Sequence, residues 1–167
     1  TGFAMLCETN PQEVMDLSPV AHLATIEGKV PFINFFDGFR TSHEIQKIEK
    51  RDYADLKEMC NMDAVAEFRA HALNPEHPAM RGSHENGDVF FQHREACNTA
   101  YNELPAIVEK YMKKVNEKLG TNYDLFNYYG APDAEHVIVA MGSINDVAEE
   151  VIDYITAKGE NIGRAHV

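Results

Sequence analysis

The chain has 167 residues, of which 44% are hydrophobic, so it is long enough to bury a core without disulfides or metals. Fifteen Lys and Arg residues stand against 27 Asp and Glu residues, which gives a formal net charge of −12 at pH 7. This charge opposes binding to nucleic acid and to an anionic membrane surface. The longest uncharged apolar stretch, around residues 31–36, is far shorter than the roughly 20 residues that span a bilayer.

Cysteine usage points to the compartment. Cys7, Cys60 and Cys97 are odd in number, widely spaced and without a CxxC pair. This pattern is typical of a reducing cytoplasm and not of a secreted disulfide framework.

The first 36 residues predict a strand, a helix and a second strand. A strand-like run, GFAMLCE, precedes Thr9 or Asn10 as the helix cap, and Pro11 fits the first helical turn. Gly28 is expected to end the helix, which Pro19 should kink or split. The run VPFINFF does not alternate, so it is expected to be a strand buried on both faces. The order predicts a parallel βαβ unit.

The middle of the chain reads as helical pieces around a long loop. Short helices are expected at HEIQKIE, DYADLKEMC and MDAVAEFRAHAL, followed by a loop rich in Pro, Gly and Asn over residues 74–88. A long amphipathic helix is expected to open at Pro105 and close at Gly120.

The strand and helix pattern then starts afresh. Residues 121–135 read as an irregular linker, HVIVAMGS as a strand with Ser143 as a helix cap, and NIGRAHV as the start of another strand. The helix between them is expected to bury Ile144, Val147, Val151, Ile152 and Ile155. The chain opens and closes inside strand-like runs, which predicts a piece of a longer α/β protein.

Polar residues cluster in DGFRTSHE, directly after the second strand. Open parallel sheets place ligands beyond the carboxyl ends of their strands, so Arg40 could clamp a carboxylate while Asp37 and Thr41 orient it. Alternatively, the segment is a turn with Gly38 at positive φ, in which Thr41 or Ser42 caps a helix. Periodicity alone favours the turn.

Two other candidate sites have simpler explanations. Histidines and acids of the middle segment suggest a metal site, but no HExxH spacing occurs, so solvated loop histidines are favoured over zinc; the group is His71, Glu76, His77, His84, Glu85 and His93. The sequence MGS before a helix could bind a phosphate, but GxGxxG and GxxxxGK[ST] are absent, so a helix cap is favoured.

Longer strings carry a resemblance to a known enzyme. The chain from Gly2 to about Ile162 resembles the N-terminal region of pyruvate:ferredoxin (flavodoxin) oxidoreductase, on the strings NPQEVMDLSPVAHLATIEGKVPFINFFDGFRTSHEIQKIE, FRAHALNPEHPAMRG, FFQHREACN, YNELPAIVEKYM and YYGAPDAEHVIVAMGS.

The resemblance implies an enzyme that cleaves pyruvate oxidatively with coenzyme A to acetyl-CoA and carbon dioxide. It implies a cytoplasmic homodimer that uses thiamine diphosphate and Mg²⁺ and passes electrons through [4Fe–4S] clusters to ferredoxin or flavodoxin. The remainder of the parent chain is then the first partner of these residues.

The resemblance also implies a division of the fold. Residues 1–130 resemble the C-terminal portion of the thiamine-diphosphate pyrimidine-binding domain, and residues 131–167 the truncated start of a domain like the C-terminal domain of transketolase. Asp37, Arg40 and Thr41 then lie either near the cofactor cleft or at a subunit or domain contact. The family's last strand stays hydrophobic after IG, whereas Arg164 and His166 interrupt it here, which puts that strand in question.

The resemblance places catalytic residues and cluster ligands outside this window. The groups that hold pyruvate and activate the cofactor lie upstream in the family, and the three cysteines lack the CxxCxxC run of four-iron clusters. We expect a piece that is inactive alone, binds no cofactor alone and holds no metal. The alternative is a free-standing α/β interaction or regulatory module without catalysis.

Overall fold

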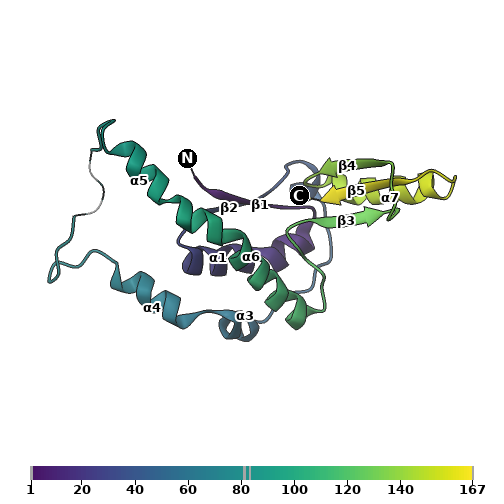
Figure 1. Ribbon diagram of the computed structural model, residues 1–167. Coiled ribbons are helices and arrows are strands. Elements are labelled where there is room, and N and C mark those ends of the chain that lie inside the picture. The colour runs from purple at the N-terminus through teal and green to yellow at the C-terminus, as the bar shows by residue number, and fades with distance from the viewer. Residues whose placement is uncertain (1, 81, 83, 167) are drawn as a thin grey trace.

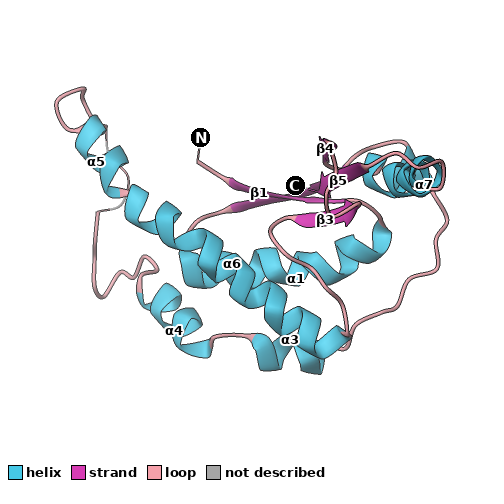
Figure 2. Cartoon of the chain, turned by 45° about the vertical axis from the view of Figure 1, so that its right-hand side comes forward, coloured by secondary structure: helices cyan, strands magenta, loops and turns pink. Residues whose placement is uncertain are grey.

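Figures 1 and 2 show a computed structural model that describes residues 2–80, 82 and 84–166. The strands form two sheets, a parallel pair β1–β2 and a mixed sheet in the order β3–β5–β4. The chain is therefore an α/β protein, as the sequence predicts. The elements in order are β1 (Ala4–Glu8), α1 (Pro11–Gly28), β2 (Phe32–Phe36), α2 (Arg40–His43), α3 (Tyr53–Met59), α4 (Met62–Ala70), α5 (Phe90–Ala96), α6 (Asn98–Leu119), β3 (Asn127–Gly130), β4 (His136–Ala140), α7 (Ile144–Thr156) and β5 (Ile162–His166).

Helix α1 begins and ends where the sequence predicts. The Asn10 carboxamide oxygen accepts hydrogen bonds from the backbone N–H groups of Gln12 and Glu13, both at 3.1 Å, and so caps the first turn. The helix ends at Gly28, and Lys29 follows in the left-handed conformation with a φ of 57°. Pro19 lies inside the helix without splitting it.

The β1–β2 pair is parallel, which confirms the predicted βαβ unit, but only one of its faces is covered. Ala4, Leu6 and Phe32 pack against the core formed by the helices. On the other face Met5 and Ile33, which are register partners, are 70% and 46% exposed. The prediction that residues 30–36 are buried on both faces is therefore wrong, because no described element lies over the second face.

Helices α1 and α6 lie side by side on the covered face of the sheet and form the core (Figure 1). Helix α6 begins at Asn98, so the prediction that Pro105 opens it is wrong. Seven residues on the N-terminal side of this proline are already helical, and Gly120 closes the helix in the left-handed conformation as predicted. The fully buried hydrophobic residues of these two helices are Val20, Ala24, Tyr111 and Val115.

Glu27 near the end of α1 ties three helices together. Its carboxylate accepts hydrogen bonds from the Tyr111 hydroxyl at 2.6 Å and from the Asn61 side chain at 3.1 Å, and it also pairs with Lys110. Burial alone would raise the pKa of Glu27, but the hydrogen bonds from Lys110, Tyr111 and Asn61 overcome this effect and lower it to about 2.

Helix α2 ends at His43, and the rest of HEIQKIE, residues 44–49, is not helical, contrary to prediction. Hydrogen bonds with α1 hold it extended: the Glu49 N–H donates to Gln12 Oε1 at 2.7 Å, and Gln12 Nε2 donates to the Glu49 carbonyl at 3.3 Å. Helices α3 and α4 form where predicted. Helices α4 and α5 bury none of their own residues, and Figure 1 shows them at the far end of the molecule from the second sheet.

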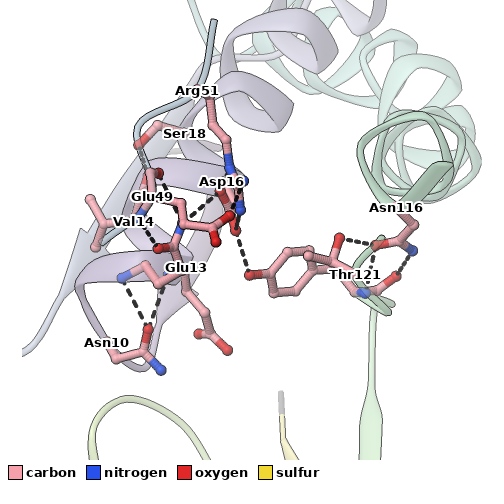
Figure 3. A network of polar contacts seen from close by, with 11 residues as sticks. Asn10, Glu13, Val14, Asp16, Ser18, Glu49, Arg51, Asn116 and Thr121 are labelled. Carbon is pink, nitrogen blue, oxygen red and sulfur yellow. Dashed lines mark hydrogen bonds and ion pairs between the residues drawn. The ribbon is translucent and has the colours of Figure 1, made fainter. Parts of the chain in front are cut away.

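A buried ion pair anchors this extended segment to α1 (Figure 3). Arg51 contacts Asp16 with two nitrogens, Nε to Oδ1 at 2.6 Å and Nη2 to Oδ2 at 3.0 Å. The Tyr123 hydroxyl also donates to Asp16 Oδ2 at 3.0 Å. One buried carboxylate therefore joins α1 to the segment after α2 and to the segment after α6.

The second sheet and its helix differ from the sequence-based predictions in three respects: the expected linker, the last strand and the buried residues of α7. Residues 121–135, expected to be a linker, contain β3, and β5 forms despite Arg164 and His166 and lies between β3 and β4. Of the α7 residues expected to be buried, only Ile152 is, since the small sheet covers little of the helix. Ile144, Val147 and Val151 are exposed.

None of the described helices is both long and apolar enough to cross a membrane.

Removing the Arg51 guanidinium should destabilise the fold. Arg51→Ala leaves the buried Asp16 carboxylate without its cation, so we expect a loss of about 3 kcal/mol in the free energy of unfolding, measured in urea. Arg40→Ala is the matched control, because Arg40 pairs with Glu44 at 3.6 Å in an exposed position. This substitution should cost less than about 1 kcal/mol. Equal losses in the two variants would contradict the role of the buried pair.

Glu8 should make stability fall as pH rises. Neither oxygen of this fully buried carboxyl has a hydrogen-bond partner among the described residues, and burial, with a smaller contribution from Glu13, raises its pKa from 4.5 to about 8. The folded state therefore holds the proton more tightly than the unfolded state does. The stability conferred by the protonated form is complete below pH 4.5 and is lost between pH 4.5 and 8.

Glu8→Gln removes this titration while keeping a neutral side chain of similar size. We expect the variant to lose less stability than the wild type, by a few kcal/mol, as pH rises through that window. Unfolding in urea at a series of pH values measures the difference. Parallel pH profiles for the two proteins would show that Glu8 keeps its ordinary pKa.

The uncovered face of β1–β2 should cause self-association. Exposed apolar faces of parallel strands are rare in soluble domains, so sedimentation velocity should show larger species as the concentration of the chain rises. Met5→Lys should weaken the association, whereas Met80→Lys, at an even more exposed methionine outside the sheet, should not. A monomer with a concentration-independent thermal transition would contradict this expectation.

Candidate functional site

The segment DGFRTSHE leaves β2 through an unusual turn. Phe39 has a φ of 60° and a ψ of −73°, and the Arg40 N–H donates to the Gly38 carbonyl at 2.7 Å. This is a γ-turn of the rare, strained kind with positive φ at its central residue. The expectation of Gly38 at positive φ is therefore wrong, because the tight reversal lies one residue later.

Asp37 accepts hydrogen bonds from two different parts of the chain. Its Oδ1 accepts from the Thr41 hydroxyl at 2.8 Å, and its Oδ2 accepts from the Ser143 backbone N–H at 3.2 Å and from the Ser143 hydroxyl. These bonds, with those from Ser143 the strongest, hold the pKa of Asp37 below its usual value. The carboxylate therefore stays ionised and joins the end of β2 to the start of α7.

Thr41 is buried and anchors this turn to the end of β1. Its hydroxyl lies 2.8 Å from Asp37 Oδ1 and 3.3 Å from the Thr9 carbonyl oxygen, and the single proton is shared between these acceptors. The structure thus brings Asp37 and Thr41 together at the end of β2. A role of these residues in binding a cofactor stays a prediction.

Arg40 is not part of this group of hydrogen bonds. Its side chain is about two-thirds exposed, and Nε lies 3.6 Å from Glu44 Oε1, one helical turn away. In the described chain, its guanidinium makes no hydrogen bond with Asp37 or Thr41. It remains available at the surface, next to the stacked rings of Phe39 and His43.

A cleft of about 740 Å³ lies between the two sheets. Its walls include Leu6 and Cys7 of β1 and Val108 of α6. They also include Asn145 and Arg164 of the second unit, which is the sheet β3–β5–β4 with helix α7, whereas the first unit is the β1–β2 pair with the helices that pack against it. Burial, followed by the nearby Glu8 and Asp37 charges, raises the pKa of the Cys7 thiol, so the thiol stays protonated. The cleft is therefore a largely apolar space with polar groups on the side of α7 and β5.

The polar side of this cleft contains groups that sequence reasoning missed. Arg164 is buried and pairs with Glu149, yet its Nε has no partner among the described residues. Asn145 is buried too: Nδ2 donates to the Gly142 carbonyl at 2.9 Å, and Oδ1 has no partner in the described part of the chain. The only local signal for them was the MGS turn before α7, because the strands bring them together across distant segments.

His166 closes the cleft next to the first sheet. Its Nε2 lies 3.3 Å from the Thr9 hydroxyl, and burial lowers its pKa, so the ring is held neutral. A second pocket, of about 700 Å³, lies between α1 and the segment before α3 and reaches Thr41. Across the described residues, no group of three His, Cys, Asp or Glu side chains is placed to hold a metal ion.

The chain matches a known family over most of its length. Residues 1–113 fit the family model described as "Pyruvate flavodoxin/ferredoxin oxidoreductase, thiamine diP-bdg". This match covers β1 to most of α6 and includes DGFRTSHE.

Curated relatives match nearly the whole chain. A pyruvate-flavodoxin oxidoreductase of Enterobacter agglomerans is 57% identical over 98% of this chain, and a pyruvate:ferredoxin oxidoreductase of Moorella thermoacetica is 54% identical over the same share. A pyruvate dehydrogenase [NADP(+)] of Cryptosporidium parvum is 48% identical over 100% of the chain. The chain spans only 14% of the first two relatives and 9% of the third. It belongs to the pyruvate flavodoxin/ferredoxin oxidoreductase family, as an N-terminal part of these enzymes.

Proposed function

We propose that these residues form part of the thiamine-diphosphate-binding region of a pyruvate:flavodoxin or pyruvate:ferredoxin oxidoreductase. The observation that carries the proposal is the identity of 54–57% over 98% of the chain to relatives with these names. The parent enzyme cleaves pyruvate oxidatively with coenzyme A to acetyl-CoA and carbon dioxide. Its electrons pass through iron–sulfur clusters to ferredoxin or flavodoxin.

The proposal includes the parent's cofactors and assembly. Thiamine diphosphate with Mg²⁺ supplies the carbanion chemistry when bound, and [4Fe–4S] clusters carry the electrons. The enzyme works in the cytoplasm as a homodimer, and the remainder of the parent chain is the immediate partner of the residues described above.

The described residues do not form a site for the metal, the diphosphate or a cluster. Both oxygens of Asp37 are already hydrogen-bonded within the chain, and Arg40 pairs with Glu44 instead of joining that group. Cys7, Cys60 and Cys97 lie on β1, after α3 and before α6, and none is paired with another. We therefore derive no catalytic step here and assign these groups to other parts of the parent chain.

The proposed domains follow the sequence-based division. Residues 1–130 would supply the C-terminal portion of the pyrimidine-binding domain, and residues 131–167 the start of a domain like the C-terminal domain of transketolase. Strand β3, at residues 127–130 of the first proposed domain, pairs with β5 and so forms part of the second sheet. The contribution of this chain is then a scaffold: α1 and α6 support the parallel strands, and the turn after β2 contacts the next unit.

Activity should appear only in the longer polypeptide. We expect the 167-residue chain, supplied with thiamine diphosphate, Mg²⁺, pyruvate and coenzyme A, to give no pyruvate-dependent reduction of a viologen dye. The native parent polypeptide should reduce the dye, and omission of coenzyme A is the control. Turnover by the short chain would contradict the proposal, as would an inactive parent polypeptide with its cofactors loaded.

Peptide mapping in the source cells tests the same proposal without an activity assay. Peptides that continue past both ends of the printed sequence into one long chain support it. A native polypeptide confined to these residues would favour a free-standing module without catalysis.

A further inference from the structure

We infer that Asp37 is the external N-terminal cap of helix α7, and that this contact fixes the second sheet and its helix against the βαβ unit. The inference does not depend on the reaction of the parent enzyme. The sequence left two locations open for Asp37, near the cofactor cleft or at a subunit or domain contact. The inference assigns Asp37 a positioning role at a contact between the two units.

The start of α7 lacks a side-chain cap of its own. Ser143 precedes the helix, but its hydroxyl accepts no hydrogen bond from the first turn. It donates instead to Asp37, and the Ser143 N–H donates to the same carboxylate oxygen at 3.2 Å. A carboxylate at this end of a helix is stabilised both by the free N–H groups and by the helix dipole.

The turn before α7 is shaped for this contact. Gly142 has a φ of +77°, and a Cβ atom there would lie 3.5 Å from Asp37 Oδ2. The Gly142 carbonyl accepts from the backbone N–H of Asn145 at 3.1 Å and from its side-chain amide at 2.9 Å. Asn145 is buried, so it holds the turn rigid while Ser143 donates to Asp37.

The acceptor side is equally fixed. Asp37 follows β2 directly, its Oδ1 accepts from Thr41, and Thr41 is buried against the Thr9 carbonyl at the end of β1. The contact therefore joins two preorganised turns that lie 106 residues apart in the sequence. Neither partner needs a large side-chain rearrangement, so little conformational entropy is lost in forming it.

Cys7 offers a local probe of this contact. It lines the cleft between the two units, and its thiol lies within the influence of Asp37 and of the Gly142 backbone. Cys60 packs against the core of the first unit and reports on unfolding of that core. The modification rates of these two thiols therefore distinguish separation of the units from general unfolding.

The experiment measures thiol modification at each cysteine by mass spectrometry of the native polypeptide that contains these residues. We expect Asp37→Ala to raise the Cys7 rate per thiolate about tenfold while leaving the Cys60 rate unchanged, which corresponds to the loss of a charged helix cap. The rate per thiolate is taken from the dependence of modification on pH, because removal of the Asp37 charge by itself lowers the pKa of Cys7. Asp37→Asn keeps an acceptor and should give a smaller increase. Asp133→Ala, at an exposed acid in the loop after β3, is the matched control.

A double-mutant cycle isolates the contact itself. Ser143→Ala removes the hydroxyl donor, and in Asp37→Ala it should have no further effect on the Cys7 rate. An unchanged Cys7 rate in folded Asp37→Ala would overturn the inference. So would an equal rise at Cys7 and Cys60, or full additivity of the two substitutions; if Asp37→Ala fails to fold, Asp37→Asn decides by the same criteria.

Discussion

The packing of α1 against α6 on one face of a two-stranded parallel sheet governs the rest of this structure. Parallel strands have little reason to associate in water unless helices cover them, because their backbone hydrogen bonds are only slightly more favourable than hydrogen bonds to water. The core residues of the two helices supply the necessary apolar burial, and Glu27 fixes their relative position through Tyr111 and Asn61. With this layer in place, the carboxyl ends of β1 and β2 are aligned and their turns can meet the second unit.

Helix-capping and turn residues in the sequence were enough to predict most of the elements near this core. Asn10 and Gly28 delimit α1, and Gly120 ends α6, since caps and left-handed turns act within a few residues. Other features depend on distant contacts. HEIQKIE has a helical pattern, yet hydrogen bonds to Gln12 hold it extended, and no signal within the segment reveals them. Short strand β3 was missed for a similar reason, because its pairing partner β5 lies more than thirty residues later.

The candidate site shows the same limit. Polar residues at the end of a predicted strand singled out DGFRTSHE, and the structure brings two of them, Asp37 and Thr41, into contact. A role in cofactor binding stays a prediction for these two residues and for Arg40. Ser143 could not be connected to them from spacing, because the contact crosses from the first unit to the second. The family resemblance rests on long strings of residues and carried the assignment further than periodicity did. The resemblance could not show whether Asp37 lies in a cofactor cleft or at a domain contact, because the same residue can be required in either place.

Two features of the structure connect the fold to the proposal that the chemistry belongs to a longer chain. One is the apolar face of Met5 and Ile33, which a parallel sheet would normally bury. The other is the set of buried polar atoms without partners among the described residues, on Glu8, Asn145 and Arg164. Native domains keep such atoms few, because each costs on the order of 1–3 kcal/mol. Glu8 ends β1, while Asn145 and Arg164 line the cleft, so these groups surround the place where the two units meet. A capped, rigid junction between incompletely covered sheets is the arrangement expected of an internal portion of a large enzyme, in which neighbouring segments complete both the core and the site.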